Sequence, residues 1–131
     1  MHRARILLAD DNEQILQRVK FVLDGAFEVV GVACNGSEMV EKATVLQPDV
    51  IVADITMPEL TGIEAVHQII AGGYAGKIVF LTVNTEDEFI EECFREGANG
   101  YVVKSHMKTD LVAAIRAALS GEHFVSPALK R

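Results

Sequence analysis

The sequence is poor in the residues that mark several kinds of functional site. It has no tryptophan and only two cysteines, Cys34 and Cys93. Their spacing is typical of neither a metal site nor a redox pair, so we expect two buried free thiols. Four histidines also lack the spacing of metal ligands, and we expect all of them at the surface. They are His2, His67, His106 and His123.

Long apolar runs and an excess of positive charge are also missing. No apolar run reaches the roughly 18 residues that a membrane span needs, and the N-terminal segment lacks the cleavage site of a signal peptide. The sequence therefore predicts a cytoplasmic protein with no membrane partner. The formal net charge is −7, whereas contacts to nucleic-acid phosphates need clustered lysine and arginine. We expect no direct nucleic-acid binding by this chain, which leaves open a separate domain that binds it.

The chain does contain a regular alternation of strand and helix patterns. Short apolar runs predict strands at residues 4–9, 27–33, 49–53, 77–82 and 101–104. Helical spacing of apolar residues follows each strand. This order indicates an α/β fold: a doubly wound, five-stranded parallel sheet of the flavodoxin-like kind, with strand order 2-1-3-4-5 and helices on both faces. We expect this domain at residues 1–121, and a C-terminal tail or the start of a linker at residues 122–131.

Two helix starts carry the pattern of a capping box. Thr61 is followed three residues later by Glu64, and Thr85 by Glu88. In a capping box the hydroxyl of the first residue and the carboxylate of the fourth satisfy each other's backbone N–H groups. The pattern predicts that the third and fourth helices begin at these residues.

Polar side chains stand at the carboxyl ends of four predicted strands. Asp10 and Asp11 follow the first strand, Asp54 follows the third, and Thr82 and Lys104 end the fourth and fifth. Each residue alone is commonly a helix cap or a solvated group. Together they converge on one edge of a parallel sheet, where pairs of carboxylates about 4 Å apart repel by ~4 kcal/mol at an effective dielectric of 20. A bound divalent cation explains such a cluster, and all-oxygen ligands favour Mg²⁺.

Four motifs on this scaffold resemble those of the receiver domain of two-component response regulators. They are the acid pair at 10–11, D-x-x-M-P-x-x-x-G at 54–62, L-T at 81–82 and G-Y-V-V-K at 100–104. The stretch from Gly100 to Pro127 further resembles the NarL-type subfamily. There, a linker and a LuxR-type helix-turn-helix domain that binds DNA follow the receiver. The resemblance leaves open whether the chain is one part of such a protein or a stand-alone receiver.

The resemblance implies a metal-dependent phosphoacceptor. Asp54 would accept a phosphoryl group from a sensor histidine kinase. Asp11 and Asp54 would bind Mg²⁺ directly, together with the backbone carbonyl of Thr56. Asp10 would act on the ion mainly through water. The chain would be no enzyme in the usual sense, because it takes part in its own phosphorylation and dephosphorylation.

The resemblance also implies a switch. Lys104 would pair with the phosphoryl oxygens, and the Thr82 hydroxyl would bond to the same group. The ring of Tyr101 would rotate inward as Thr82 moves. These movements would change the surface formed by the fourth helix, the fifth strand and the fifth helix. The change would control an output, with transcription as the expected one, and homodimers on phosphorylation are a further possibility.

Two other functions fit parts of the pattern. A phosphatase of the haloacid-dehalogenase type also uses an aspartate at a strand end, but it needs a second acid two residues later, where this chain has Thr56. A protein-binding module of the same fold that is not phosphorylated is expected to have lost Asp11, Asp54 or Lys104, and all three are present. Flavin binding is not expected, because no phosphate-binding loop rich in serine, threonine and glycine follows the first strand.

Overall fold

One parallel sheet of six strands forms the centre of the computed structural model, which describes residues 3–129. The strands lie in the order β2-β1-β3-β4-β5-β6. Their bounds are β1 (Arg5–Ala9), β2 (Glu28–Ala33), β3 (Val50–Ala53), β4 (Lys77–Thr82), β5 (Gly100–Val103) and β6 (Phe124–Val125). The predicted fold class and the order of the first five strands are therefore confirmed.

The predicted number of strands was wrong, because β6 adds a sixth. It has only two residues, Phe124 and Val125, and pairs in parallel with β5. So short a strand has no apolar run that a sequence pattern identifies, and its pairing depends on the neighbouring strand. β6 lies inside the segment 122–131 that we expected to be a tail or linker, while residues 130–131 lie outside the described part. The domain boundary at residue 121 stays a prediction.

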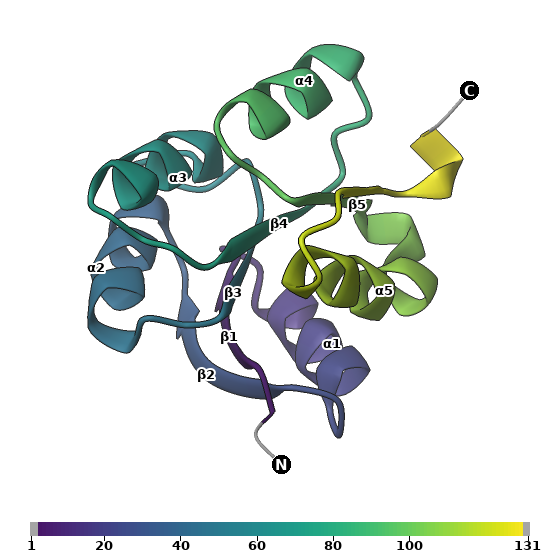
Figure 1. Ribbon diagram of the computed structural model, residues 1–131, viewed down its shortest axis with the longest axis horizontal. Coiled ribbons are helices and arrows are strands. Elements are labelled where there is room, and N and C mark those ends of the chain that lie inside the picture. Colours follow the sequence, from purple (N-terminus) through teal and green to yellow (C-terminus); the bar gives the residue numbers. More distant parts are fainter. Residues whose placement is uncertain (1–2, 130–131) are drawn as a thin grey trace.

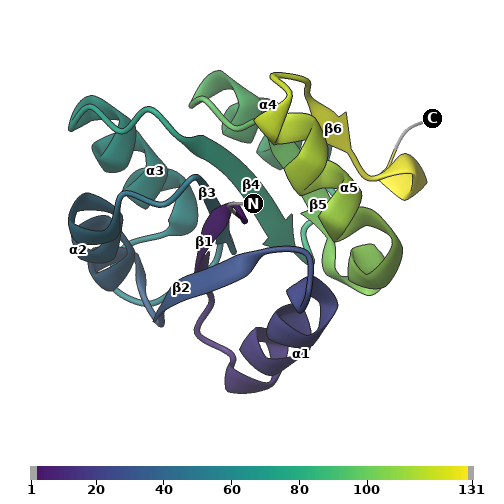
Figure 2. The same ribbon diagram turned by 60° about the horizontal axis from the view of Figure 1, so that its bottom comes forward.

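Five helices cover the two faces of the sheet (Figures 1 and 2). They are α1 (Glu13–Leu23), α2 (Gly36–Leu46), α3 (Gly62–Ala71), α4 (Asp87–Arg95) and α5 (Met107–Leu119). Helices α1 and α5 pack on one face, and α2, α3 and α4 pack on the other. Two short 3₁₀ turns, η1 (Lys104–His106) and η2 (Pro127–Leu129), follow β5 and β6. None of the helices in the described part of the chain is long and apolar enough to span a membrane.

The central strands are buried on both faces, which explains why their sequences are apolar throughout rather than alternating. Every residue of β3 and β5 is buried. Alternate side chains of β3 enter opposite cores, with Val50 and Val52 facing α1 and α5, and Ile51 facing α2 and α3. Because each strand is packed on both faces, the position and direction of its end are fixed. The residue that follows the strand is therefore held in a defined place.

The capping boxes show how local contacts decide a helix start. In α3 the box is confirmed: Thr61 Oγ1 accepts from Glu64 N–H (3.2 Å), and the Glu64 carboxylate accepts from Thr61 N–H (3.1 Å). The box predicted at Thr85 was wrong, because α4 begins after Glu86 and has no side-chain cap. The preceding residue, Asn84, is hydrogen-bonded to the end of β4 instead, which keeps this segment in the loop.

The thiols and histidines agree with expectation except at one residue. Cys93, on the inner face of α4, is buried as predicted. Cys34 is exposed, because it follows the edge strand β2 at the rim of the sheet. The described histidines are at the surface, as predicted. They are His67, His106 and His123. The prediction for His2 falls outside the described residues.

Candidate functional site

The carboxyl ends of β1, β3, β4 and β5 meet at one edge of the sheet. Because the winding of the chain reverses between β1 and β3, this edge is where such folds bind ligands. It brings together Asp10 and Asp11 after β1, Asp54 after β3 and Lys104 after β5. One carboxylate oxygen from each of the three acids lies within 4.8 Å of the others. The predicted acid cluster and its lysine are therefore present in the structure.

The acids differ in their exposure to solvent. Asp10 is only 3 % exposed and Asp54 only 6 %, whereas Asp11 is exposed. Two buried carboxylates side by side are costly unless they are paired with a cation and hydrogen-bonded. Each has an oxygen held by the backbone: Asp10 Oδ1 accepts from Asn12 N–H (2.9 Å), and Asp54 Oδ1 accepts from Ile55 N–H (2.7 Å). These bonds fix both carboxylates in orientation.

Lys104 supplies positive charge to both buried acids. Its Nζ lies 2.8 Å from Asp10 Oδ2 and 2.9 Å from Asp54 Oδ2, and its side chain is 12 % exposed. Burial lowers the pKa of Lys104, but the hydrogen bonds to Asp10 and Asp54 and their negative charge outweigh it and raise that pKa above its ordinary value. Burial raises the pKa of Asp10, and the bond to Lys104 opposes that rise. The two acids therefore favour the charged form of Lys104, whose ammonium supplies positive charge to this site.

The donor set suits a hard divalent cation. Three carboxylates and one ammonium leave a formal net charge of −2 at the edge of the sheet. Carboxylate oxygens are the ligands that Mg²⁺ prefers, and the exposure of Asp11 leaves room for the waters that this ion retains. The residues therefore fit the expected acidic Mg²⁺ pocket. The part predicted for the carbonyl of Thr56 stays a prediction.

A glycine holds the loop after Asp54 against the strand. A Cβ added at Gly62 would lie 1.9 Å from the Asp54 carbonyl oxygen, so no side chain fits there. The Gly62 N–H donates to the Ile55 carbonyl oxygen at 2.7 Å. Between these contacts the chain turns through Glu59, whose φ is +69°. Gly62, the last residue of the D-x-x-M-P-x-x-x-G motif, thus lets the start of α3 lie directly against the backbone of Asp54, the first residue of that motif.

Thr82 and Tyr101 meet at Asn84 rather than at Asp54. The Thr82 hydroxyl donates to Asn84 Oδ1 (2.8 Å), and the Tyr101 hydroxyl donates to the Asn84 carbonyl oxygen (2.9 Å). Both residues are fully buried. The ring of Tyr101 is therefore already inside, whereas we expected it to rotate inward with Thr82. The predicted roles of both residues remain predictions.

One buried residue near the site was not predicted from the sequence. Ser126, directly after β6, is fully buried, and its Oγ accepts from Val103 N–H at 3.1 Å. Val103 immediately precedes Lys104 in the chain. The available signal was small: an apolar pair, Phe124 and Val125, and then one serine.

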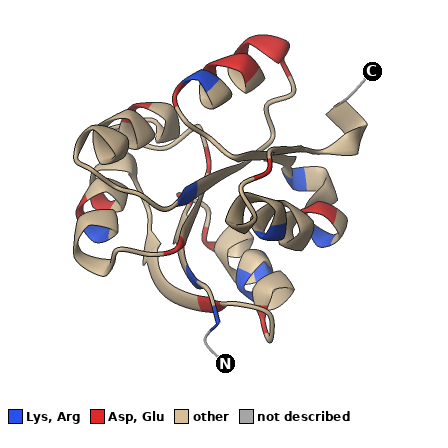
Figure 3. Ribbon diagram, viewed as in Figure 1, with Lys and Arg blue, Asp and Glu red and all other residues tan. Residues whose placement is uncertain are grey.

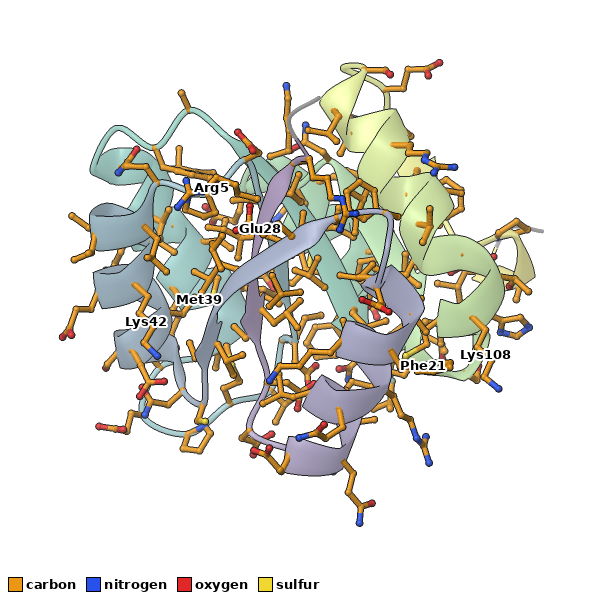
Figure 4. The ribbon with its side chains drawn as sticks, turned by 90° about the horizontal axis from the view of Figure 1, so that it is seen from below. Arg5, Phe21, Glu28, Met39, Lys42 and Lys108 are labelled. Atoms are coloured by element: carbon orange, nitrogen blue, oxygen red, sulfur yellow. The ribbon has the colours of Figure 1, made fainter. Side chains whose placement is uncertain are left out.

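A groove of about 880 Å³ lies beside the site, between α1 and the start of α5. Lys104 lines one side of it, and the exposed Phe21 of α1 lines the other. Figure 4 shows Phe21 and Lys108 near each other in this region. Arg18 and Lys108 make the groove basic, whereas α4 carries mostly acidic residues at its surface (Figure 3).

Comparisons with known proteins agree with this geometry. Residues 6–116 match the family model described as the response regulator receiver domain. The chain is 35 % identical over 128 residues to the nitrate/nitrite response regulator protein NarL of Escherichia coli K12, covering 96 % of this chain and 59 % of NarL. It is 38 % identical over 120 residues to the transcriptional regulatory protein LiaR of Bacillus subtilis, covering 90 % of this chain and 57 % of LiaR. The chain thus spans less than two thirds of these relatives.

Among solved structures, a LuxR-family two-component response regulator from Aurantimonas superposes with a TM-score of 0.92 at 32 % identity. The match covers 97 % of this chain and 92 % of that one. The response regulator domain of Thermotoga maritima CheB gives 0.85 at 32 % identity, covering 91 % and 98 %. With the acid cluster and its lysine in place, the chain belongs to the receiver domains of two-component response regulators, of the NarL and LuxR type.

Proposed function

We propose that Asp54 accepts a phosphoryl group from the phosphohistidine of a sensor histidine kinase. The observation that best supports this is the position of its carboxylate, at the end of β3 beside Asp10 and Asp11 and 2.9 Å from Lys104 Nζ. A carboxylate is a competent nucleophile for this transfer. Phosphoryl transfer otherwise depends on positioning and on stabilising negative charge, which this edge of the sheet supplies.

In the proposed step an oxygen of Asp54 bonds to phosphorus while the bond from phosphorus to the histidine nitrogen breaks. The electron pair of the broken bond stays with that nitrogen. The Lys104 ammonium stabilises the negative charge on the phosphoryl oxygens. When Mg²⁺ is bound, it supplies further positive charge there. The proposed direct ligands are Asp11, Asp54 and the carbonyl of Thr56, and Asp10 acts through water.

The same phosphoryl group is proposed to drive the switch. The Thr82 hydroxyl leaves Asn84 and bonds to the phosphoryl oxygens, which frees the loop before α4. Tyr101 is held to the same loop through the Asn84 carbonyl, so the two residues respond together. The surface of α4, β5 and α5 then changes, because the phosphoryl group makes these contacts in one state only.

The partners follow from this role. We assign the basic groove with the exposed Phe21, which Lys104 also lines, to contact with the histidine kinase. The output is transcription, through a DNA-binding helix-turn-helix domain outside this chain, and the protein acts in the cytoplasm, with homodimers forming on phosphorylation. The receiver has no separate substrate, and it takes part in its own phosphotransfer and dephosphorylation.

The alternatives have less support. In a haloacid-dehalogenase-type phosphatase the second acid would stand where this chain has Thr56, which cannot donate or accept a proton as a carboxyl group does. A binding module without phosphorylation has no need for buried acids, yet Asp10 and Asp54 are both buried and joined by Lys104.

The test is phosphorylation by acetyl phosphate with Mg²⁺, followed by intact mass. We expect a gain of one phosphoryl group that requires the ion. Asp54→Asn removes the nucleophile and abolishes the gain. Asp24→Asn, at the C-terminus of α1, is the matched control and keeps it. An Asp54→Asn variant that gains mass at the wild-type rate contradicts the assignment.

A further inference from the structure

The segment after α5 returns to the sheet and is bonded to the strand that leads into Lys104. The amide of Phe124 donates to the Asn99 carbonyl (3.0 Å), and the amide of Ser126 donates to the Tyr101 carbonyl (2.9 Å). Figures 1 and 2 show the segment, in yellow, running beside β5. Residues 124–126 therefore form a part of the folded domain and are hydrogen-bonded to β5 along the edge that faces away from β4.

Side chains fasten the same segment on both faces of the sheet. Phe124 packs against the cluster beneath α1 and α5, while Leu129 packs against the cluster on the other face of the sheet, beneath α2, α3 and α4. The ring of His123 lies 5.1 Å from that of Phe94 on α4, centroid to centroid. The segment is thus held by α4, β5 and α5 at once.

Ser126 makes the contact closest to the functional site. Its Oγ accepts from Val103 N–H at 3.1 Å, and the serine is fully buried. Without this oxygen the buried Val103 N–H has no acceptor, because β6 ends one residue before Ser126. A buried amide left unpaired is costly, so the end of β5 would shift to find another partner.

The end of β5 decides where Lys104 lies. Lys104 follows Val103 directly, and its Nζ reaches Asp10 and Asp54 in bonds of 2.8 and 2.9 Å. A small displacement of Val103 therefore moves the ammonium away from the place where phosphoryl oxygens would bind. Catalysis by preorganised charge is sensitive to such displacements.

We infer that Ser126 is a positioning residue, which acts through the Val103 amide to hold Lys104 in place for the phosphoryl group. This inference rests on the proposed phosphoacceptor function and extends the functional unit beyond α5. By linkage, whatever pulls residues 122–129 away from β5 weakens phosphoryl binding, and phosphoryl binding in turn strengthens the pairing of β6. The segment that leads out of the domain is thereby coupled to Asp54.

The experiment measures the affinity for beryllofluoride, a phosphoryl mimic, in the presence of Mg²⁺. Ser126→Ala is expected to weaken it roughly three- to tenfold, the effect of one lost hydrogen bond. Ser126→Thr keeps the hydroxyl and restores most of the affinity. Tyr74→Phe is the matched control, since it removes one hydrogen bond to a backbone carbonyl, that of Pro48, before the start of β3. It is expected to bind the mimic as wild type does.

The affinity for Mg²⁺ alone shows whether Ser126→Ala displaces only Lys104 or disturbs the whole acidic site. Lys104 is not a proposed metal ligand, and its ammonium competes with the ion for the oxygens of Asp54. Ser126→Ala should therefore bind Mg²⁺ alone at least as tightly as wild type does. Equal losses for Mg²⁺ and for the mimic, or unchanged affinity for the mimic, overturn the inference. If wild type itself takes no beryllofluoride, the proposed function fails, and amide exchange then decides about Ser126. Faster exchange at both Val103 and Ile55 in Ser126→Ala supports the positioning role, and a wild-type exchange rate at either amide refutes it.

Discussion

Replacing Lys104 by methionine keeps most of the length of the side chain and removes its charge. In the absence of divalent ions, the variant leaves Asp10 and Asp54 buried side by side without their cation, at 3 % and 6 % exposure. Removing one partner of a buried ion pair typically costs about 3–5 kcal/mol. For a domain of this size that lowers the melting temperature by roughly 10–18 °C. We therefore expect Lys104→Met to be much less stable than wild type at pH 7.5 in chelator.

The loss of stability in Lys104→Met should grow as the pH rises. Burial raises the pKa of Asp10 above 3.8 in the folded protein, and Lys104 opposes this. Without the lysine the folded-state pKa rises further, so the folded variant takes up a proton that the unfolded chain does not hold. A carboxyl group with a raised pKa is least destabilising at low pH, and stability is lost as the pH rises through the folded value. The deficit of the variant is therefore largest above neutrality and narrows toward pH 5.

Adding Mg²⁺ should change the stability of the variant in the opposite direction. The ion binds the folded site only, so it stabilises by mass action, by about 2.7 kcal/mol at a hundredfold excess over its dissociation constant. In Lys104→Met no ammonium competes for the oxygens of Asp54, and the gain should exceed that of wild type. Urea melts at pH 5 and 7.5, in chelator and in Mg²⁺, measure all three effects. Lys108→Met, an exposed lysine in α5, is the control. Equal stability of Lys104→Met and wild type in chelator at pH 7.5 would refute the reasoning.

Three further predictions concern the metal, the loop and the thiols. Asp11→Asn should lower Mg²⁺ affinity at least tenfold by titration calorimetry, with stability in chelator equal to or slightly above wild type, because the exposed Asp11 then loses only a screened repulsion. Gly62→Ala should lower the free energy of unfolding by about 1–3 kcal/mol in urea, because its Cβ would clash with the Asp54 carbonyl, whereas Gly72→Ala has room and should be neutral. Native protein at pH 8 should react with a thiol reagent only at Cys34, since burial raises the pKa of Cys93 to about 12; equal labelling of both thiols would contradict this.

The sequence was most informative about the residues whose positions the sheet topology alone decides. Parallel strands end at one edge, so Asp10, Asp54 and Lys104 had to meet once the strand order was known. It was least informative where a contact depends on another element. Nothing local to Thr85 shows that Asn84 is bonded to Thr82 and Tyr101, which delays the start of α4.

The exposure of Cys34 and the pairing of β6 depend on similar distant contacts. Cys34 follows an apolar strand, but that strand is the edge β2, so the thiol reaches solvent. Phe124 and Val125 become a strand only because β5 has a free edge. In both cases the deciding fact is the position of a strand within the sheet, which an apolar run does not report.

The sixth strand also limits how two receivers can associate. An open edge of a sheet is a template on which a second chain can add a strand. Here Phe124 and Val125 pair with β5, and Ser126 takes the Val103 amide, so the backbone of β5 offers no row of free donors to a neighbour. A continuous sheet across two copies through β5 is therefore blocked while residues 124–126 stay in place. The outer edge of β6 offers only two residues for strand pairing. A homodimer on this side of the molecule would therefore rely mainly on the side chains of α4 and α5, which can be remodelled and separated without breaking a strand pair.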